Sequence, residues 1–236
     1  MIGASLGRGI PHLAIFDSLV GGNSAEVLAR IDSRTEIHDP HAGRIRGVDA
    51  IARYLDDRAA WLASTNAVAI PLDYTEDVRL SLEEVDIELD GPEGRATMPT
   101  AVVIEQADDG AISELRMYFS AWFRRGEQTT RSPLLPVDGA LRGPEIVERY
   151  HELLAEGDGP ALGELFAKDS YVREPMGTIA VGLSEVQRWH RQFAEGDGSG
   201  MPLHWCSRIS DGRVVAFEYM ADQWGTRHFA PIGGLS

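Results

Sequence analysis

The sequence predicts an α+β protein built from two copies of one domain. The first observation is a pattern that recurs at a constant offset of 135 residues. An acid–proline pair at 39–40 returns at 174–175, the glycine at 47 returns at 182, and the aliphatic residue at 51 returns at 186. The second observation is that helical periodicity precedes strand-like alternation in each half, which is the order of an α+β domain. Self-similarity at about half the chain length indicates duplication rather than a solenoid of short repeats.

The first half begins with helical segments and ends with strands. After the glycine at 47, apolar residues at 48, 51, 52, 55, 59 and 62 keep the spacing of a helix that packs on a sheet. The proline at 40 ends the strand before it, and Asp-Gly-Pro and Asp-Asp-Gly sequences mark later turns. The expected helices cover 13–20, 26–31 and 48–62, and the expected strands cover 35–40, 77–82, 85–89, 95–105 and 112–123.

The second half follows the same order after a linker. Residues 126–143 carry threonines, prolines and glycines without either periodicity, so we place the two domains at 1–125 and 144–236. Only five residues follow Pro231, so this copy is expected to lack the counterpart of the last strand of the first copy. The expected helices cover 146–155, 161–167 and 183–193, and the expected strands cover 170–175, 204–209, 213–219 and 224–232.

Composition limits the classes of partner. The 236 residues are 43% hydrophobic and 25% charged, as in soluble globular proteins. A formal net charge of −15 opposes binding to phosphate backbones and anionic lipids, so we expect no nucleic acid and no membrane partner. A hydrophobic or weakly charged small molecule fits better. No stretch approaches the roughly 18 apolar residues of a membrane span and no signal peptide is evident, which predicts a cytoplasmic protein. The single Cys206 excludes an internal disulfide and a thiolate metal cluster.

Several short motifs together resemble a known superfamily. The acid–proline pair before a glycine-led helix, with segments 147–150, 155–158, 217–219 and 230–232, is similar to the nuclear-transport-factor-2-like or SnoaL-like proteins. That superfamily includes ketosteroid isomerase, polyketide cyclases, scytalone dehydratase and limonene epoxide hydrolase, and the second half is most similar to ketosteroid isomerase. The resemblance implies two tandem cone-shaped domains, each with three helices packed on a curved antiparallel sheet in a cystatin-like α+β barrel. It also implies that the halves form an intramolecular pseudo-dimer.

The resemblance further implies cofactor-independent proton transfer on a hydrophobic carbonyl compound, by an isomerase, a cyclase or a dehydratase. Such chemistry requires a carboxylate, hydrogen-bond donors for the developing enolate oxygen and an apolar cavity, as ketosteroid isomerase illustrates. In the second copy, Glu174 takes the place of the base and Tyr150, 24 residues earlier, the place of the donor. The aromatic residues expected to line this cavity are Trp189, Phe193, Phe217 and Phe229.

Each copy departs from the family pattern. In the second copy, Gly233 stands where the family has a protonated acid. In the first copy, Asp39 occupies the position of the base, but Ile15 stands 24 residues before it and cannot donate a side-chain hydrogen bond. Arg116 and Tyr118 resemble the Arg-x-Tyr motif near the end of SnoaL-like domains. They are expected to place a donor at the substrate pocket or, being on one face of a strand, to point at a partner sheet.

Other interpretations stay open. An acid before a proline is common in turns, and Tyr150 also fits the buried stripe of a helix. The chain could therefore be a non-catalytic binding or scaffold protein, or a water-activating hydrolase like limonene epoxide hydrolase that uses Asp39 and Arg116. No cofactor is expected. No metal is expected either, because His38 and His41 lie on a strand and a turn, without the i, i+4 helical spacing of zinc motifs.

Overall fold

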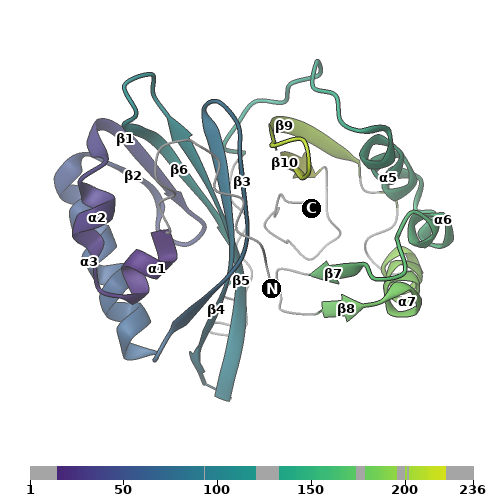
Figure 1. Ribbon diagram of the computed structural model, residues 1–236, viewed down its shortest axis with the longest axis horizontal. Coiled ribbons are helices and arrows are strands. Elements are labelled where there is room, and N and C mark those ends of the chain that lie inside the picture. Colours follow the sequence, from purple (N-terminus) through teal and green to yellow (C-terminus); the bar gives the residue numbers. More distant parts are fainter. Residues whose placement is uncertain are drawn as a thin grey trace.

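The computed structural model describes residues 15–92, 94–120, 133–173, 179–195, 200 and 202–221. Figure 1 shows a six-stranded sheet in the first half, with three helices on one face and the second half on the other. None of the described helices is both long enough and apolar enough to cross a bilayer.

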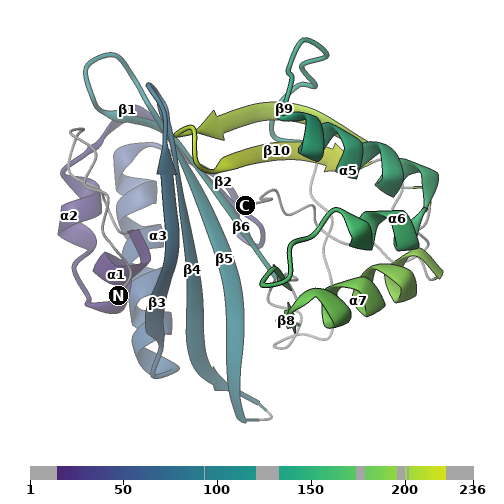
Figure 2. The ribbon, with the colours of Figure 1, turned by 45° about the vertical axis from the view of Figure 1, so that its right-hand side comes forward.

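The first half has the predicted α+β architecture. Its sheet order is β2-β1-β6-β5-β4-β3, and neighbouring strands are antiparallel except for β1 and β6, which are parallel. The sheet is curved around the helices (Figure 2). The helices are α1 (Ile15–Val20), α2 (Ser24–Leu28) and α3 (Val48–Ser64), and the strands are β1 (Ile31–Asp39), β2 (Gly43–Arg46), β3 (Val68–Glu76), β4 (Leu80–Gly91), β5 (Gly94–Gln106) and β6 (Ile112–Phe119).

Strands β2 and β3 were not predicted from the sequence, and the two strands predicted at 77–82 and 85–89 form the single strand β4. The alternation of β3 is interrupted by a bulge between Pro71 and Asp73, and β2 has four residues without a buried hydrophobic one, so neither has a clear strand pattern. Strand β4 is continuous through Glu83 and Glu84, two acids that break its apolar pattern in the sequence. The helix expected at 26–31 ends earlier, because α2 stops at Leu28 and β1 begins at Ile31.

The second half contains three helices and two strand pairs among its described residues. The strands β7 and β8 form one antiparallel pair, and β9 and β10 form another. The strand expected at 224–232 lies outside the described residues. The helices are α5 (Glu145–Glu156), α6 (Gly159–Glu164) and α7 (Leu183–Glu195), and the strands are β7 (Tyr171–Arg173), β8 (Ile179–Val181), β9 (Leu203–Ser210) and β10 (Val215–Ala221).

The offset of 135 residues is present in the backbone. Strands β1 and β2 pair Glu36 with Arg46, Ile37 with Ile45 and His38 with Arg44. Strands β7 and β8 pair the residues 135 positions later, 171 with 181, 172 with 180 and 173 with 179. Gly47 and Gly182 precede the next helix with φ of 86° and 80°, values that favour glycine. The carbonyl oxygen of each glycine accepts hydrogen bonds from the backbone N–H groups of the residues three and four positions later. This agreement supports two copies, while the boundaries 1–125, 126–143 and 144–236 stay a prediction.

The two halves meet across the sheet face that the helices α1–α3 leave free (Figure 2). The apolar part of this contact joins β4, β5 and β6 to β9 and β10, and it consists of Leu82, Ala101, Val103, Tyr118, Ile209 and Ala216. Two ion pairs flank it: Arg173 with Asp86, and Arg213 with Asp73 at 3.1 Å. The central strands β4, β5 and β6 are therefore buried on both faces over much of their length.

Candidate functional site

Asp39, the predicted base of the first copy, is enclosed by hydrogen-bond donors. It ends β1 and is 1% exposed. One carboxylate oxygen accepts the backbone N–H groups of His41 and Ala42, both at 2.7 Å, and the other accepts the Tyr54 hydroxyl at 2.6 Å and pairs with Arg58. Burial alone would raise the pKa of Asp39, but the Arg58 charge and these hydrogen bonds hold it below its usual range. A carboxylate so engaged is a weak proton acceptor.

The partners Tyr54 and Arg58 were missed by the sequence analysis. They are four residues apart on α3, beside the stripe of buried residues that the periodicity identified, and this i, i+4 placement was the available signal. The Arg58 guanidinium lies 5.3–5.5 Å from the ring centres of Tyr54, Trp61 and Phe119. Burial and the Asp39 charge raise the pKa of Tyr54. Asp39, Tyr54 and Arg58 thus form one ion-paired group that aromatic rings cover.

The interior around Asp39 is filled by side chains. Eighteen hydrophobic residues of α1–α3, β1 and β4–β6 form one cluster, and none is more than 2% exposed. Ile15, at the position of the family's donor, belongs to this cluster. Exposure this low leaves no space for water beside these side chains. The described interior of the first half is therefore that of a packed core.

Arg116 and Tyr118 lie on the opposite face of the sheet from Asp39. Arg116 is 1% exposed and donates from Nε and from a terminal nitrogen to Glu218 of β10, at 2.7 and 2.9 Å. The Tyr118 hydroxyl donates to the same carboxylate at 2.5 Å, and the Ser207 hydroxyl also donates to it. The structure therefore brings these two residues to a contact between the halves and not into one site with Asp39, as a water-activating set would require.

In the second half, the structure gathers the predicted aromatic residues around two buried histidines. Tyr150 contacts both His151 and His190 with ring centres 5.9 Å apart. Trp189 contacts His190 at 4.8 Å and stacks on Phe193 at 5.0 Å. The ring of Phe217 lies 6.3 Å from His151 and stacks on Trp205 at 4.3 Å. Glu174 and Phe229 lie outside the described residues.

The hydrogen bonds of the two histidines fix their tautomers. His151 Nδ1 accepts from the indole N–H of Trp205, so in the neutral ring Nε2 carries the proton. His190 Nδ1 lies 2.9 Å from the carbonyl oxygen of Val186, which can only accept, so Nε2 of the neutral ring bears the lone pair. Burial lowers the pKa of His151 to about 4 and also lowers that of His190. Both Nε2 atoms are buried and have no hydrogen-bond partner among the described residues.

The Tyr150 hydroxyl has the properties of an unused donor. Burial raises its pKa to about 12, so the phenol keeps its proton at neutral pH. No described residue forms a hydrogen bond with this hydroxyl, whereas the Tyr54 hydroxyl of the first half is held by Asp39. The pKa of Tyr219 on β10 is raised by burial and by Tyr150, which places this second phenol in the same environment. The sequence analysis did not use the histidines, because their buried nitrogens are evident only in the fold.

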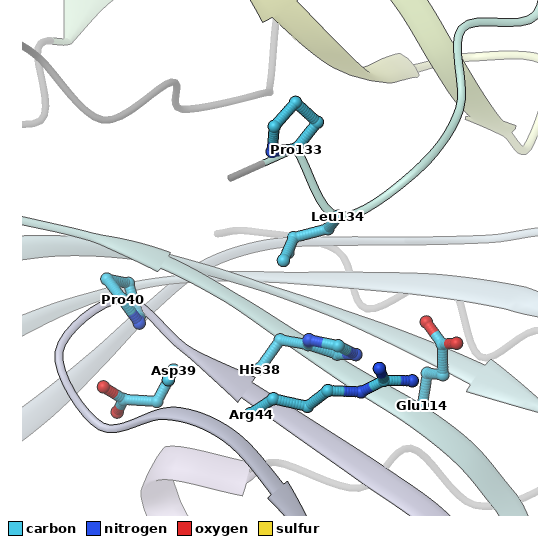
Figure 3. Close-up of a pocket in the computed structure, with 8 residues that line it drawn as sticks. His38, Asp39, Pro40, Arg44, Glu114, Pro133 and Leu134 are labelled. Atoms are coloured by element: carbon cyan, nitrogen blue, oxygen red, sulfur yellow. The ribbon is translucent and has the colours of Figure 1, made fainter. Parts of the chain in front are cut away.

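A separate cavity of about 370 Å³ lies on the face of β1 opposite the carboxylate of Asp39 (Figure 3). Its lining comes from the end of β1, from β2, from β6 and from the segment that enters the second half. His38 of this lining is 7% exposed, and burial lowers its pKa against the opposing effect of Glu114 and Glu36. The lining residues are His38, Asp39, Pro40, Gly43, Arg44, Glu114, Pro133 and Leu134.

No protein-family model matches the chain, and no curated protein matches its sequence. Solved structures with a similar fold are NTF2-like or ketosteroid isomerase-like proteins, each covering about half of the chain. An NTF2-like protein from Cytophaga hutchinsonii has 13% identity and a TM-score of 0.39, over 44% of this chain and 92% of its own. A ketosteroid isomerase-like protein from Catenulispora acidiphila, in complex with trimethylamine, has 13% identity and a TM-score of 0.39, over 50% and 92%. The epoxide hydrolase/cyclase-like enzyme SalBIII has 15% identity and a TM-score of 0.38, over 45% and 85%.

Proposed function

We propose that the second half of the chain binds a hydrophobic carbonyl compound and catalyses proton transfer next to the carbonyl group, as an isomerase, a cyclase or a dehydratase that needs no cofactor. Tyr150 donates a hydrogen bond to the oxygen that becomes negative, and Glu174 moves the proton. The ligand lies against the aromatic residues Trp189, Phe193 and Phe217.

The observation that carries this proposal is the hydroxyl of the half-buried Tyr150, which has no hydrogen-bond partner among the described residues. A donor that is not consumed by the protein is available to a developing oxyanion, and in a site that excludes water the interaction is strong. The neighbouring Nε2 atoms of His151 and His190 add one donor and one acceptor within the same aromatic group. In the first half the corresponding position is Ile15, and the carboxylate of Asp39 is already paired. The contrast favours the second copy as the working one.

The role of Glu174 rests on the repeat. The offset of 135 relates it to Asp39, whose two side-chain partners are Tyr54 and Arg58. The same offset places Trp189 and Phe193 where Tyr54 and Arg58 stand. The repeat would thus bring Glu174 next to apolar rings, and a carboxylate in such surroundings has a pKa above its usual range, which suits a group that must take and return a proton near neutral pH.

The test is turnover of a β,γ-unsaturated 3-ketosteroid, followed by ultraviolet absorption of the conjugated product. Removing one oxyanion donor costs about 10²–10³ in rate, so we expect Tyr150→Phe to lower kcat by that factor and Glu174→Gln to abolish turnover. Tyr171→Phe is the matched control, because it removes the same hydroxyl from a tyrosine of the same half that is 52% exposed. Unchanged turnover in Tyr150→Phe would refute the assignment of the donor.

A second candidate is a binding or scaffold protein without catalytic activity. The packed interior of the first half and its closed Asp39–Arg58 pair favour this role for that copy. Binding of a phenolic steroid without turnover of any ketosteroid would support it for the whole chain.

We also propose that the halves form an intramolecular pseudo-dimer, supported by the apolar contact between the two halves and the buried Arg116–Glu218 pair. The protein should then sediment as a monomer at micromolar concentration. A tight dimer under these conditions would contradict the pseudo-dimer.

A further inference from the structure

The side chains of Glu36, His38 and Glu114 converge on the sheet face that carries the cavity. One ligand atom of each lies within 4.8 Å of the other two, and His38 Nε2 is 3.6 Å from a Glu36 oxygen. Glu36 and Glu114 are direct neighbours in the parallel register of β1 and β6. We propose that these three residues bind a first-row divalent metal ion, with Zn²⁺ as the reference ion.

The position of His38 in the cavity wall is the observation that indicates a metal site. Its side chain is buried and lines the 370 Å³ cavity, and Figure 3 shows the ring directed toward Glu114. It forms no hydrogen bond with any described residue, and its contact with Glu36 at 3.6 Å is an ion pair only if the ring is protonated. In its neutral form the imidazole ring offers a nitrogen lone pair to a metal ion. A metal ion at this point would contact the ring nitrogen and both carboxylates at once.

The charge of this face favours a cation. The carboxylates of Glu105, Glu114 and Glu218 share one buried guanidinium, that of Arg116, and Glu36 is the neighbour of Glu114 on the adjacent strand. Two further arginines balance Glu36: Arg44 at 2.5 Å and Arg46 at 2.6 Å. Their side chains are 52% and 58% exposed, so both can turn into solvent at a cost of about 1 kcal/mol or less each. Their departure leaves an excess of negative charge around His38.

The ligand types select the ion. An imidazole nitrogen with two carboxylates suits Zn²⁺ or Co²⁺, whereas Mg²⁺ prefers oxygen ligands alone. In a tetrahedral site with metal–ligand distances of about 2.0–2.2 Å, the ligand atoms lie about 3.3–3.6 Å apart. The observed limit of 4.8 Å therefore requires the most widely separated ligand atoms to approach one another by about 1.2–1.5 Å. The cavity leaves the fourth position open to water or to a small ligand.

The test is calorimetric titration of the untagged, chelator-treated full-length protein with ZnCl₂, with Co²⁺ absorption in the visible range as a second readout. We expect one ion per chain and little response to Mg²⁺. His38→Ala and Glu114→Gln should each weaken binding by at least about 100-fold, since even outer-shell changes cost 10–100-fold. Arg44→Gln should tighten it by about two- to five-fold, because a competing ion pair of about 0.5–1 kcal/mol is removed. Glu88→Gln, which changes a carboxylate paired with Arg95 elsewhere on the sheet, is the control.

The proposal is overturned if the wild type binds Zn²⁺ no more tightly than about 1 mM. It is also overturned if His38→Ala binds as the wild type does, because the ion would then sit at other histidines. The tighter binding of Arg44→Gln guards against a fold defect, since a misfolded variant would not gain affinity. None of these readouts depends on ketosteroid turnover, so the outcome is independent of the function proposed for the second half.

Discussion

Replacing Arg116 by methionine should destabilise the protein more than any single change at its carboxylate partners. The guanidinium is buried between the halves and binds three carboxylates: Glu218 through two nitrogens, and Glu105 and Glu114 through a third, at 2.9 and 2.8 Å. Glu105 and Glu114 are each 32% exposed and can be hydrated after the change, but the Glu218 side chain is 4% exposed. Arg116→Met therefore leaves one buried anion with hydroxyl donors alone.

The magnitude follows from this asymmetry. Removing one partner of a buried ion pair costs about 3–5 kcal/mol, because the remaining charge is uncompensated, and we expect this range for Arg116→Met. Glu218→Gln should cost only about 1–3 kcal/mol, since Arg116 keeps its two other carboxylates. The double variant should lose about 1–3 kcal/mol less than the sum of the single losses, because the two groups interact directly.

Unfolding in urea at pH 7, followed by tryptophan fluorescence, measures these losses. Arg44→Met is the matched control, because it removes an arginine that is 52% exposed from an ion pair with Glu36 and should cost at most about 1 kcal/mol. If Arg116→Met costs no more than this control, or if the two single losses add without coupling, the pair is hydrated and does not hold the halves together. Either result would refute the reasoning.

Three further outcomes are expected. Asp39→Asn should cost about 2–4 kcal/mol at pH 7 and progressively less as the pH falls below about 4, since the lowered pKa means that the stabilisation is present above the unfolded-state pKa near 4 and is lost as the pH falls through the folded-state value; urea unfolding across pH tests this. Burial raises the pKa of Glu83 to about 7, so its ionisation should destabilise the protein as the pH rises from about 4.5 to 7. We therefore expect Glu83→Gln to be about 1–3 kcal/mol more stable than the wild type at pH 8 and equally stable at pH 4. Equal stability at pH 8 would contradict the raised pKa. Gly159→Ala should lower the Tm, because its Cβ would lie 2.5 Å from the carbonyl oxygen of His190, whereas Gly139→Ala meets nothing within 4 Å and should leave the Tm unchanged.

The sequence determined the parts of the fold that depend on local periodicity. The helix α3 follows from its stripe of buried residues, and the shared geometry at Gly47 and Gly182 follows from the repeat. The strands β2 and β3 escaped prediction because their residues are mostly exposed or interrupted by a bulge, so burial left no regular pattern in them.

The candidate site was predictable in part. The resemblance to the SnoaL-like proteins singled out Tyr150, Trp189 and Phe193, which the structure places close to His190 or to one another. It did not identify Tyr54 and Arg58 as partners of Asp39, nor the buried Nε2 atoms of His151 and His190 that lack a partner among the described residues. Each of these features is a contact between elements distant in the chain, and no local pattern encodes it.

By itself, the sequence determined a pattern that recurs at an offset of 135 residues, with an acid–proline pair in each half. Only the tertiary structure decided what surrounds Asp39 and which face of β6 meets which partner. Arg116 illustrates the reason: its main partner, Glu218, is 102 residues away, and a strand directs alternate side chains to opposite faces. Local preferences specify the strand, but the packing of a second sheet decides whether an inward-facing arginine serves a ligand pocket or joins the two halves.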